Sequence, residues 1–99
     1  MQIKEVERLT GMTRANIRFY EKQGLLNKTI RNEYNYREYT MEDVSQLQRI
    51  KLLRQMEVPI EEIKAVKDDV SEMERMILER LRNLNNSVEK IVYKNDIGR

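Results

Sequence analysis

Two glycines, Gly11 and Gly24, each follow a short segment of helical character, and this punctuation constrains the fold more than any other feature. The first segment has apolar residues at three-residue steps: Ile3, Val6 and Leu9. Such spacing predicts a short amphipathic helix that ends at a glycine C-cap. Thr13 is a good N-cap for a second helix, over residues 14 to 23, that stops before Gly24. The sequence therefore predicts two short helices joined by a tight turn, which is the helix-turn-helix arrangement.

The second predicted helix has one basic face. At about 100° per residue, Arg14, Arg18 and Lys22 fall within one narrow arc. Ile17 and Tyr20 lie toward the other side, so we expect the helix to pack by its apolar side and to present the basic stripe outward. No obvious protein partner for the stripe stands on that face, which favours a polyanion as its ligand. A merely solvated basic face is the alternative.

Residues 27 to 40 have no helical period and are rich in β-forming and turn-forming residues. This composition predicts a short β-hairpin with its turn at residues 32 to 35. Ile30 is expected to begin the inward packing of the first arm, and Tyr36 and Arg37 are expected on the return strand. The hairpin would add a second basic element beside the helical stripe.

Two further helices are predicted after the hairpin. Thr40 and Asp43 resemble a capping box, and apolar residues then follow at three-residue steps to about residue 57. These apolar residues are Val44, Leu47, Ile50, Leu53 and Met56. They predict a central core helix. Pro59 suits the first turn of the next helix, which Ile63 and its apolar neighbours at steps of three would carry to about Asp69.

The C-terminal part carries a heptad pattern. Ser71 with Glu74 is interpreted as a second capping box, which would start the last helix. Apolar residues then alternate steps of four and three: Ile77, Leu81, Leu84, Val88 and Ile91. A helix of about 24 residues would reach roughly 36 Å, too far for so small a domain to cover. The pattern predicts a coiled-coil dimer seam over about residues 72 to 95, and packing back on the chain's own domain is the alternative.

Charge is distributed unevenly along the chain. Residues 1 to 60 hold 11 Lys and Arg against 8 Asp and Glu, whereas residues 61 to 99 hold 8 against 9. A polyanion is therefore expected to bind the N-terminal part. Charged residues make up 36% of the whole chain, which favours an elongated helical shape with much surface.

Several functional classes are disfavoured by composition. The chain has no Cys and no His, so it has neither disulfides nor the usual ligands of transition metals, and we expect no metal site and no cofactor. The same lack, with the absence of a glycine-rich phosphate loop, argues against an enzyme. No stretch of 18 apolar residues is present, so no membrane partner is expected and the cytoplasm is the expected location.

In this order, the pieces resemble the MerR family of bacterial transcription regulators. The resemblance rests on Thr10-Gly11, Ile17-Arg18-Phe19-Tyr20-Glu21, Gly24-Leu25-Leu26, Tyr36-Arg37 with Tyr39, and Leu52-Leu53-Arg54 leading to Ile60-Glu61-Glu62-Ile63. It implies a mainly α fold with a winged helix-turn-helix DNA-binding domain over residues 1–70, including a small β-hairpin wing. A long coiled-coil dimerisation helix and short tail would follow over residues 71–99. Where the family commonly has Asn-Gly before Tyr-Arg, this chain has Tyr34-Asn35.

The resemblance also implies which side chains meet DNA. Backbone contacts map to Arg18 and Tyr20 of the helix and to Arg31, Tyr36 and Arg37 of the wing, with Arg54 in the following helix. Lys22 belongs to the same basic stripe, and Tyr20 also has a reading as a core tyrosine. Chemistry alone adds a base-reading set at the start of the second helix: Arg14, Ala15 and Asn16 suit guanine, the thymine methyl and adenine respectively.

As a function, the resemblance implies a homodimer that binds an inverted-repeat promoter operator, bends and untwists it, and acts on RNA polymerase. An architectural DNA-binding factor of the excisionase kind and a coiled-coil adaptor dimer are the alternatives. A chain of 99 residues is expected to be either a minimal member that needs no effector or the N-terminal part of a longer protein.

Overall fold

The computed structural model describes the backbone of residues 1–27 and 30–97 and the side chains of residues 1–27 and 31–85. Helices dominate this part of the chain. In order, the elements are α1 (Ile3–Thr10), α2 (Arg14–Lys22), β1 (Ile30–Arg31), β2 (Arg37–Glu38), α3 (Met41–Gln55), α4 (Ile60–Ala65) and α5 (Val70–Ile97). The predicted mainly α architecture with a small hairpin and a long last helix is confirmed.

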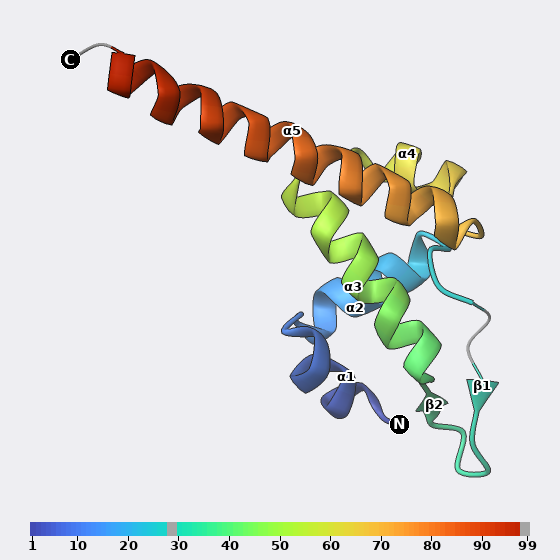
Figure 1. Ribbon diagram of the computed structural model, residues 1–99. Coiled ribbons are helices and arrows are strands. Elements are labelled where there is room, and N and C mark those ends of the chain that lie inside the picture. The colour runs from blue at the N-terminus through green and yellow to red at the C-terminus, as the bar shows by residue number, and fades with distance from the viewer. Residues whose placement is uncertain (28–29, 98–99) are drawn as a thin grey trace.

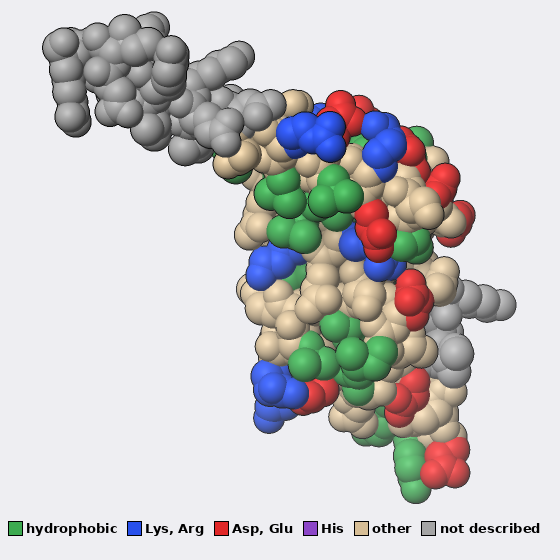
Figure 2. Space-filling model, viewed as in Figure 1, with side chains coloured by type: hydrophobic (Ala, Val, Ile, Leu, Met, Phe, Trp, Pro, Cys, Tyr) green, Lys and Arg blue, Asp and Glu red, His purple; other side chains and the backbone are tan. Residues whose placement is uncertain are grey.

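The helix α3 runs through the middle of the molecule, with the hairpin near one of its ends and α5 across the other (Figure 1). The distal part of α5 extends well away from the other elements, and the molecule measures 67 × 26 × 18 Å. On the face seen in Figure 2, hydrophobic side chains gather over the end of α3 that lies next to α5. Lys and Arg on this face are interspersed with Asp and Glu.

The helix-turn-helix unit forms as predicted from its glycine and threonine signals. Gly11 follows α1 with φ 70°, and its N–H donates to the Glu7 carbonyl at 2.9 Å. A residue with a side chain is strained at such a positive φ, which explains the glycine. Thr13 caps α2, since its Oγ1 accepts from the Asn16 N–H at 3.2 Å. Gly24, with φ 75°, follows the end of α2.

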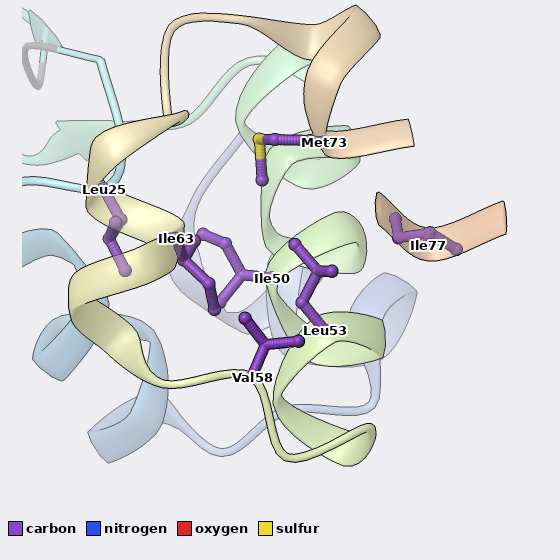
Figure 3. Packing of buried hydrophobic residues seen from close by; sticks show 7 residues of the cluster. All are labelled: Leu25, Ile50, Leu53, Val58, Ile63, Met73 and Ile77. Atoms are coloured by element: carbon purple, nitrogen blue, oxygen red, sulfur yellow. The ribbon is translucent and has the colours of Figure 1, made fainter. Parts of the chain in front are cut away.

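The core consists of two clusters that share α3. Over the described residues, one cluster packs the helix-turn-helix unit on α3 and on Tyr39, which follows the wing: Val6, Met12, Ile17, Tyr39, Val44 and Leu47. The other joins α3, α4 and the start of α5, and Figure 3 shows its members facing one another: Leu25, Ile50, Leu53, Val58, Ile63, Met73 and Ile77. Four of the predicted α3 core positions are at most 2% exposed, which confirms α3 as the central core helix. Met56, the fifth, is half-buried and packs against the second cluster.

Of the helix starts after the hairpin, one agrees with the sequence and two differ. The Thr40–Asp43 box is complete, because the Asp43 N–H donates to Thr40 Oγ1 at 3.1 Å and the Thr40 N–H donates to Asp43 Oδ2 at 2.9 Å. Pro59 is the N-cap of α4 and so stands just before the helix, which ends at Ala65, earlier than predicted.

The predicted Ser71–Glu74 box at the start of α5 is wrong. Asp69 takes that role, since its Oδ1 accepts from the Glu72 N–H at 3.0 Å and the helix begins at Val70. Ser71 therefore lies inside the first turn. Asp69 stands directly before the first helical residue, where a side chain can accept from the free N–H groups of the first turn, whereas Ser71 already lies within that turn.

Candidate nucleic-acid interface

The exposed face of α2 is formed as the helical wheel predicts. Ile17 is fully buried, whereas Ala15, Asn16, Arg18 and Lys22 are exposed. The side chains of Arg18 and Lys22 make no hydrogen bond or ion pair with any residue whose side chain the structure describes. Two cations of this helix are thus available to an anionic ligand.

Arg14 differs from the expectation that the whole stripe lacks a protein partner. Its Nε lies 3.2 Å from Glu7 Oε1, across the turn between α1 and α2. Both side chains remain partly exposed, at 50% and 33%. An ion pair this exposed contributes at most about 1 kcal/mol, so DNA can compete for Arg14.

Tyr20 lies between surface and core. It is half-buried and packs against both hydrophobic clusters, which supports its reading as a core tyrosine. Its ring meets Phe19 edge-on, with centroids 5.4 Å apart and planes at 63°. Phe19 itself is 43% exposed, so the helix carries an apolar ring beside its basic stripe. Contact between the Tyr20 hydroxyl and the DNA backbone stays a prediction.

The wing is a two-stranded antiparallel hairpin with Arg31 opposite Arg37. Asn32 builds the turn: its carbonyl accepts from the Asn35 N–H at 2.9 Å, and its Oδ1 accepts from the Tyr34 and Tyr36 N–H groups at 2.9 and 3.1 Å. Asn35 has φ 65°, so an asparagine takes the left-handed conformation for which glycine is usual. The predicted turn at residues 32 to 35 is confirmed.

One prediction about the wing is wrong, and another concerns a side chain outside the described residues. Tyr36 lies between the turn and β2, directly before the strand, so it is not within the return strand as predicted, although its carbonyl accepts from the Asn32 N–H across the hairpin at 2.9 Å. The prediction that Ile30 packs inward concerns a side chain outside the described residues. Tyr36 is 62% exposed and Tyr34 is 72% exposed. Tyr34 was not among the predicted contacts, although its place at the wing tip in the sequence was a usable signal.

An open pocket joins the wing to the recognition helix. It brings together the predicted contacts Arg18, Arg31, Tyr36 and Arg37, and its remaining walls come from Gln2, Ile3, Asn35 and Tyr39. Arg31 is exposed, and its Nη1 donates to the neutral Asn35 carbonyl at 2.9 Å. No acid among the described side chains pairs with it, and a phosphate oxygen suits this position chemically.

Arg37 has a different environment, because it pairs with a buried acid. Its Nη1 donates to Glu21 Oε2, and the Tyr39 hydroxyl donates to Glu21 Oε1. The Glu21 side chain is 8% exposed. Burial, followed by the hydrogen bond to Glu21, raises the pKa of Tyr39 to about 12. Sequence reasoning placed Glu21 in the family motif without assigning it this role.

Arg54 lies on the exposed side of α3. Its Nη1 donates to the Val58 carbonyl at 2.9 Å, and it shares a surface hollow with Thr13 and Asn16 at the start of α2. In the same hollow, Lys51 Nζ donates to the Thr10 carbonyl at 2.9 Å and so caps α1. Arg54 thus stands in a hollow beside the start of the recognition helix, separate from the wing pocket.

The predicted dimer seam is divided by the structure. Ile77 is only 8% exposed and belongs to the chain's own core, so it is not part of an exposed stripe. Leu81 and Leu84 are 44% and 60% exposed, and Leu78, which was not predicted, is 63% exposed. The side chains of Val88 and Ile91 lie outside the described residues.

Over the described residues, no three acidic, His or Cys side chains come together in a way that would hold a metal ion. No helix in this part of the chain has the length and apolar character needed to span a membrane.

Comparisons with known proteins agree with this architecture. Residues 1–70 match the MerR HTH family regulatory protein model. The HTH-type transcriptional regulator CueR of Escherichia coli O157:H7 is 39% identical over 62 residues, which are 63% of this chain and 46% of that protein. CueR of Vibrio cholerae El Tor is 36% identical over 66 residues, 67% of this chain and 48% of that protein. The chain thus spans about half the length of these relatives.

Solved structures share the fold over nearly the whole chain. HiNmlR, described as a MerR family regulator lacking the sensor domain and bound to promoter DNA, superposes with a TM-score of 0.76 at 21% identity, covering 97% of this chain and 78% of that one. The transcriptional regulator SkgA of Caulobacter crescentus superposes with a TM-score of 0.79 at 27% identity, covering 96% and 71%. With its helix-turn-helix, its hairpin wing and a family match over residues 1–70, this chain belongs to the MerR family.

Proposed function

We propose that this protein is a DNA-binding transcription regulator that binds an inverted-repeat promoter operator as a homodimer. The observation that carries the proposal is the pocket in which Arg18 of the recognition helix and Arg31 of the wing stand together without an acidic partner among the described side chains. A polyanion suits such a site. HiNmlR, which shares the fold, is bound to promoter DNA in its solved structure, and this supports DNA as the ligand.

The recognition helix α2 supplies the base-reading side chains. Arg14, Ala15 and Asn16 are exposed in its first turn, where a helix inserted into the major groove meets base edges. Arg14 leaves Glu7 to reach a guanine, at the small cost of an exposed ion pair. Arg18, Lys22 and the Tyr20 hydroxyl face the phosphate backbone.

Backbone contacts at both sides of the helix fix its register on the duplex. The wing contributes Arg31 and Tyr36, and Arg37 stands with them in the pocket. Arg54 of α3 approaches the backbone beside the start of α2. Phosphate contacts of this kind position a protein without reading sequence, so their loss weakens binding to every duplex alike.

Dimerisation through α5 completes the proposal. Residues 1–70 form the DNA-binding domain, and residues 71–99 form the dimerisation helix and tail. Leu81 and Leu84 expose apolar surface on the same side of α5 as the buried Ile77, since steps of four and three return to one face of a helix. A second α5, packed antiparallel, would cover this surface and set the spacing of the two recognition helices.

The regulatory step follows the family resemblance. A dimer bound between the two promoter elements would bend and untwist the DNA, so that RNA polymerase meets both elements in phase. Distortion of this kind costs several kcal/mol, and the wings at both ends offset it by backbone contacts that form on bent DNA.

Binding-site selection on random duplexes tests the function. We expect an inverted repeat, bound with a steep salt dependence because each subunit releases counterions from several phosphates. Circular-permutation gel shifts on the selected duplex then test bending, and we expect mobility to depend on the position of the site. Weak binding without sequence preference would contradict an operator-specific regulator. Uniform mobility would contradict the distortion step alone.

A further inference from the structure

Three side chains from the recognition helix and the wing meet at one carboxylate. Glu21 lies in the last turn of α2, Arg37 begins β2, and Tyr39 follows that strand. One Glu21 oxygen accepts from Arg37 Nη1 and the other accepts from the Tyr39 hydroxyl. The Glu21 side chain is 8% exposed and Tyr39 is 3% exposed. Both oxygens of this buried carboxylate are therefore engaged in a contact that ties α2 to the return arm of the wing, with the Arg37 guanidinium partly exposed on its outer side.

The energetics of burial favour keeping this contact in the complex with DNA. A carboxylate removed from water is costly unless a cation and hydrogen bonds compensate it, and breaking a buried pair on one side costs far more than an exposed pair contributes. If Arg37 turned toward a phosphate, Glu21 would be left with the neutral Tyr39 hydroxyl alone. The phosphate would also approach an unbalanced negative charge.

Arg31, directly opposite on the other strand, provides the contrast. It is exposed, and among the described residues its guanidinium donates only to the neutral Asn35 carbonyl, so a phosphate can bind it without leaving one of these acids unpaired. Arg37 is 38% exposed and its charge is offset by Glu21. The sequence does not distinguish the two wing arginines. In the structure, Arg31 presents about one unit of positive charge to DNA, whereas the Arg37–Glu21 pair is neutral overall.

We propose that Glu21 and Arg37, with Tyr39, form a neutral positioning unit that fixes the wing against the recognition helix, and that Arg31 alone supplies the wing's phosphate-binding charge. This inference rests on the proposed DNA-binding function and assigns Arg37 a role other than the phosphate contact implied by the family resemblance. The raised pKa of Tyr39 is consistent with it, because the hydroxyl stays a neutral donor throughout the pH range of a binding assay.

The salt dependence of DNA binding separates positioning from phosphate contact. The slope of log K against log salt counts released counterions at about 0.9 per phosphate. Arg31→Ala is therefore expected to flatten the slope by about 1.8 in a dimer. Arg37→Gln is expected to weaken binding by about tenfold through loss of wing position, while the slope stays near that of the unmutated protein.

A charge-balanced double variant provides the second readout. Glu21→Gln combined with Arg37→Gln keeps a side-chain hydrogen bond possible between the two positions and leaves no buried charge. We expect it to recover most of the affinity lost in Arg37→Gln, since the positioning unit needs neutrality and contact more than it needs the arginine charge. This variant also guards against misfolding of the single variant, and circular dichroism of each protein monitors the fold.

The slope decides between the alternatives. A change in Arg37→Gln smaller than half of that in Arg31→Ala supports the positioning role. A change of half or more, without recovery in the double variant, overturns it and makes Arg37 a phosphate ligand. In both cases the unmutated protein still binds duplex DNA with a steep slope. If the unmutated protein shows no salt-dependent binding to duplex DNA, the proposed function fails instead.

Discussion

The two ends of this molecule differ in whether their apolar side chains are buried within the chain. In the winged helix-turn-helix part, four apolar residues on one face of α3 are at most 2% exposed, and they pack in the two clusters that join α1, α2, α4 and Tyr39 to this helix: Val44, Leu47, Ile50 and Leu53. Along α5, the pattern continues past Ile77, but Leu78, Leu81 and Leu84 are exposed. The first region packs against itself, whereas the second exposes an apolar stripe of the kind that marks an interaction surface. Local sequence patterns look alike in both, so burial is what separates a core from an interface.

The largest expected effect is in the core. Leu53→Ala removes a fully buried side chain that packs with Ile50, Val58 and Ile63 in the cluster shared by α3, α4 and α5. We expect the free energy of unfolding to fall by about 2–5 kcal/mol, measured by urea denaturation. Leu52→Ala is the matched control, since Leu52 is 41% exposed, and it should cost less than about 1 kcal/mol. Equal costs would mean that α3 is not packed as described.

On α5, the corresponding change should affect assembly more than folding. Leu84→Glu places a charge on the exposed apolar stripe, where a second subunit would have to bury it. We expect the mass by light scattering at micromolar concentration to fall from dimer to monomer, while circular dichroism shows that most of the helical signal is retained. Arg82→Glu, two residues away and on another side of the helix, should leave the dimer intact. A monomeric unmutated protein would contradict the dimer.

Sequence reasoning succeeded where the outcome is decided within a few residues. Thr13, Thr40 and Gly11 cap helices because each group meets a backbone partner three or four positions away. The turn at Asn35 is likewise local. The apolar steps along α3 predicted its buried side because one helix face suffices to define it.

Contacts between distant segments could not be read in this way. Glu21 accepts from a residue 16 positions along the chain, and this pairing exists only once the wing has folded against α2. Arg14 reaches Glu7 because the turn brings α1 beside α2. Ile77 enters the core because α5 crosses α3, so a residue with ideal seam spacing serves the chain's own packing instead. In each case the tertiary arrangement selects among uses that the local pattern leaves open.

The wing network should make stability depend on alkaline pH. The folded-state pKa of Tyr39, about 12, lies above the ordinary value of 10, so the neutral hydroxyl is favoured by the fold. Its contribution is present below pH 10 and is lost as the pH rises through 12. Of the charged groups that contact it, Glu21 opposes its ionisation and Arg37 favours it.

Tyr39→Phe tests this dependence by chemical denaturation between pH 7 and 11. At pH 7 we expect a loss of about 1–2 kcal/mol, since Glu21 Oε1 loses its donor. Above pH 10 the difference between the variant and the unmutated protein should shrink. Tyr36→Phe, at an exposed position without a part in this network, should shift neither value. A difference that stays constant with pH would show that the hydroxyl does not titrate against the fold.

The smallest effect concerns where α5 begins, and it sharpens the boundary between the two regions. Asp69 Oδ1 accepts from the Glu72 N–H at 3.0 Å, whereas Ser71 lies inside the first turn and is exposed. An N-cap side chain contributes about 0.5–2 kcal/mol, and its acidic charge also interacts favourably with the helix dipole. Asp69→Ala should therefore lower the free energy of unfolding by about 1 kcal/mol, and Ser71→Ala should change it by less than about 0.5 kcal/mol. Because Met73 and Ile77 of the following turns pack on α3, this loss should appear in the unfolding of the DNA-binding domain as well as in dimer dissociation. A larger loss of unfolding free energy for Ser71→Ala than for Asp69→Ala would contradict the N-cap at Asp69. It would indicate that α5 begins at the serine.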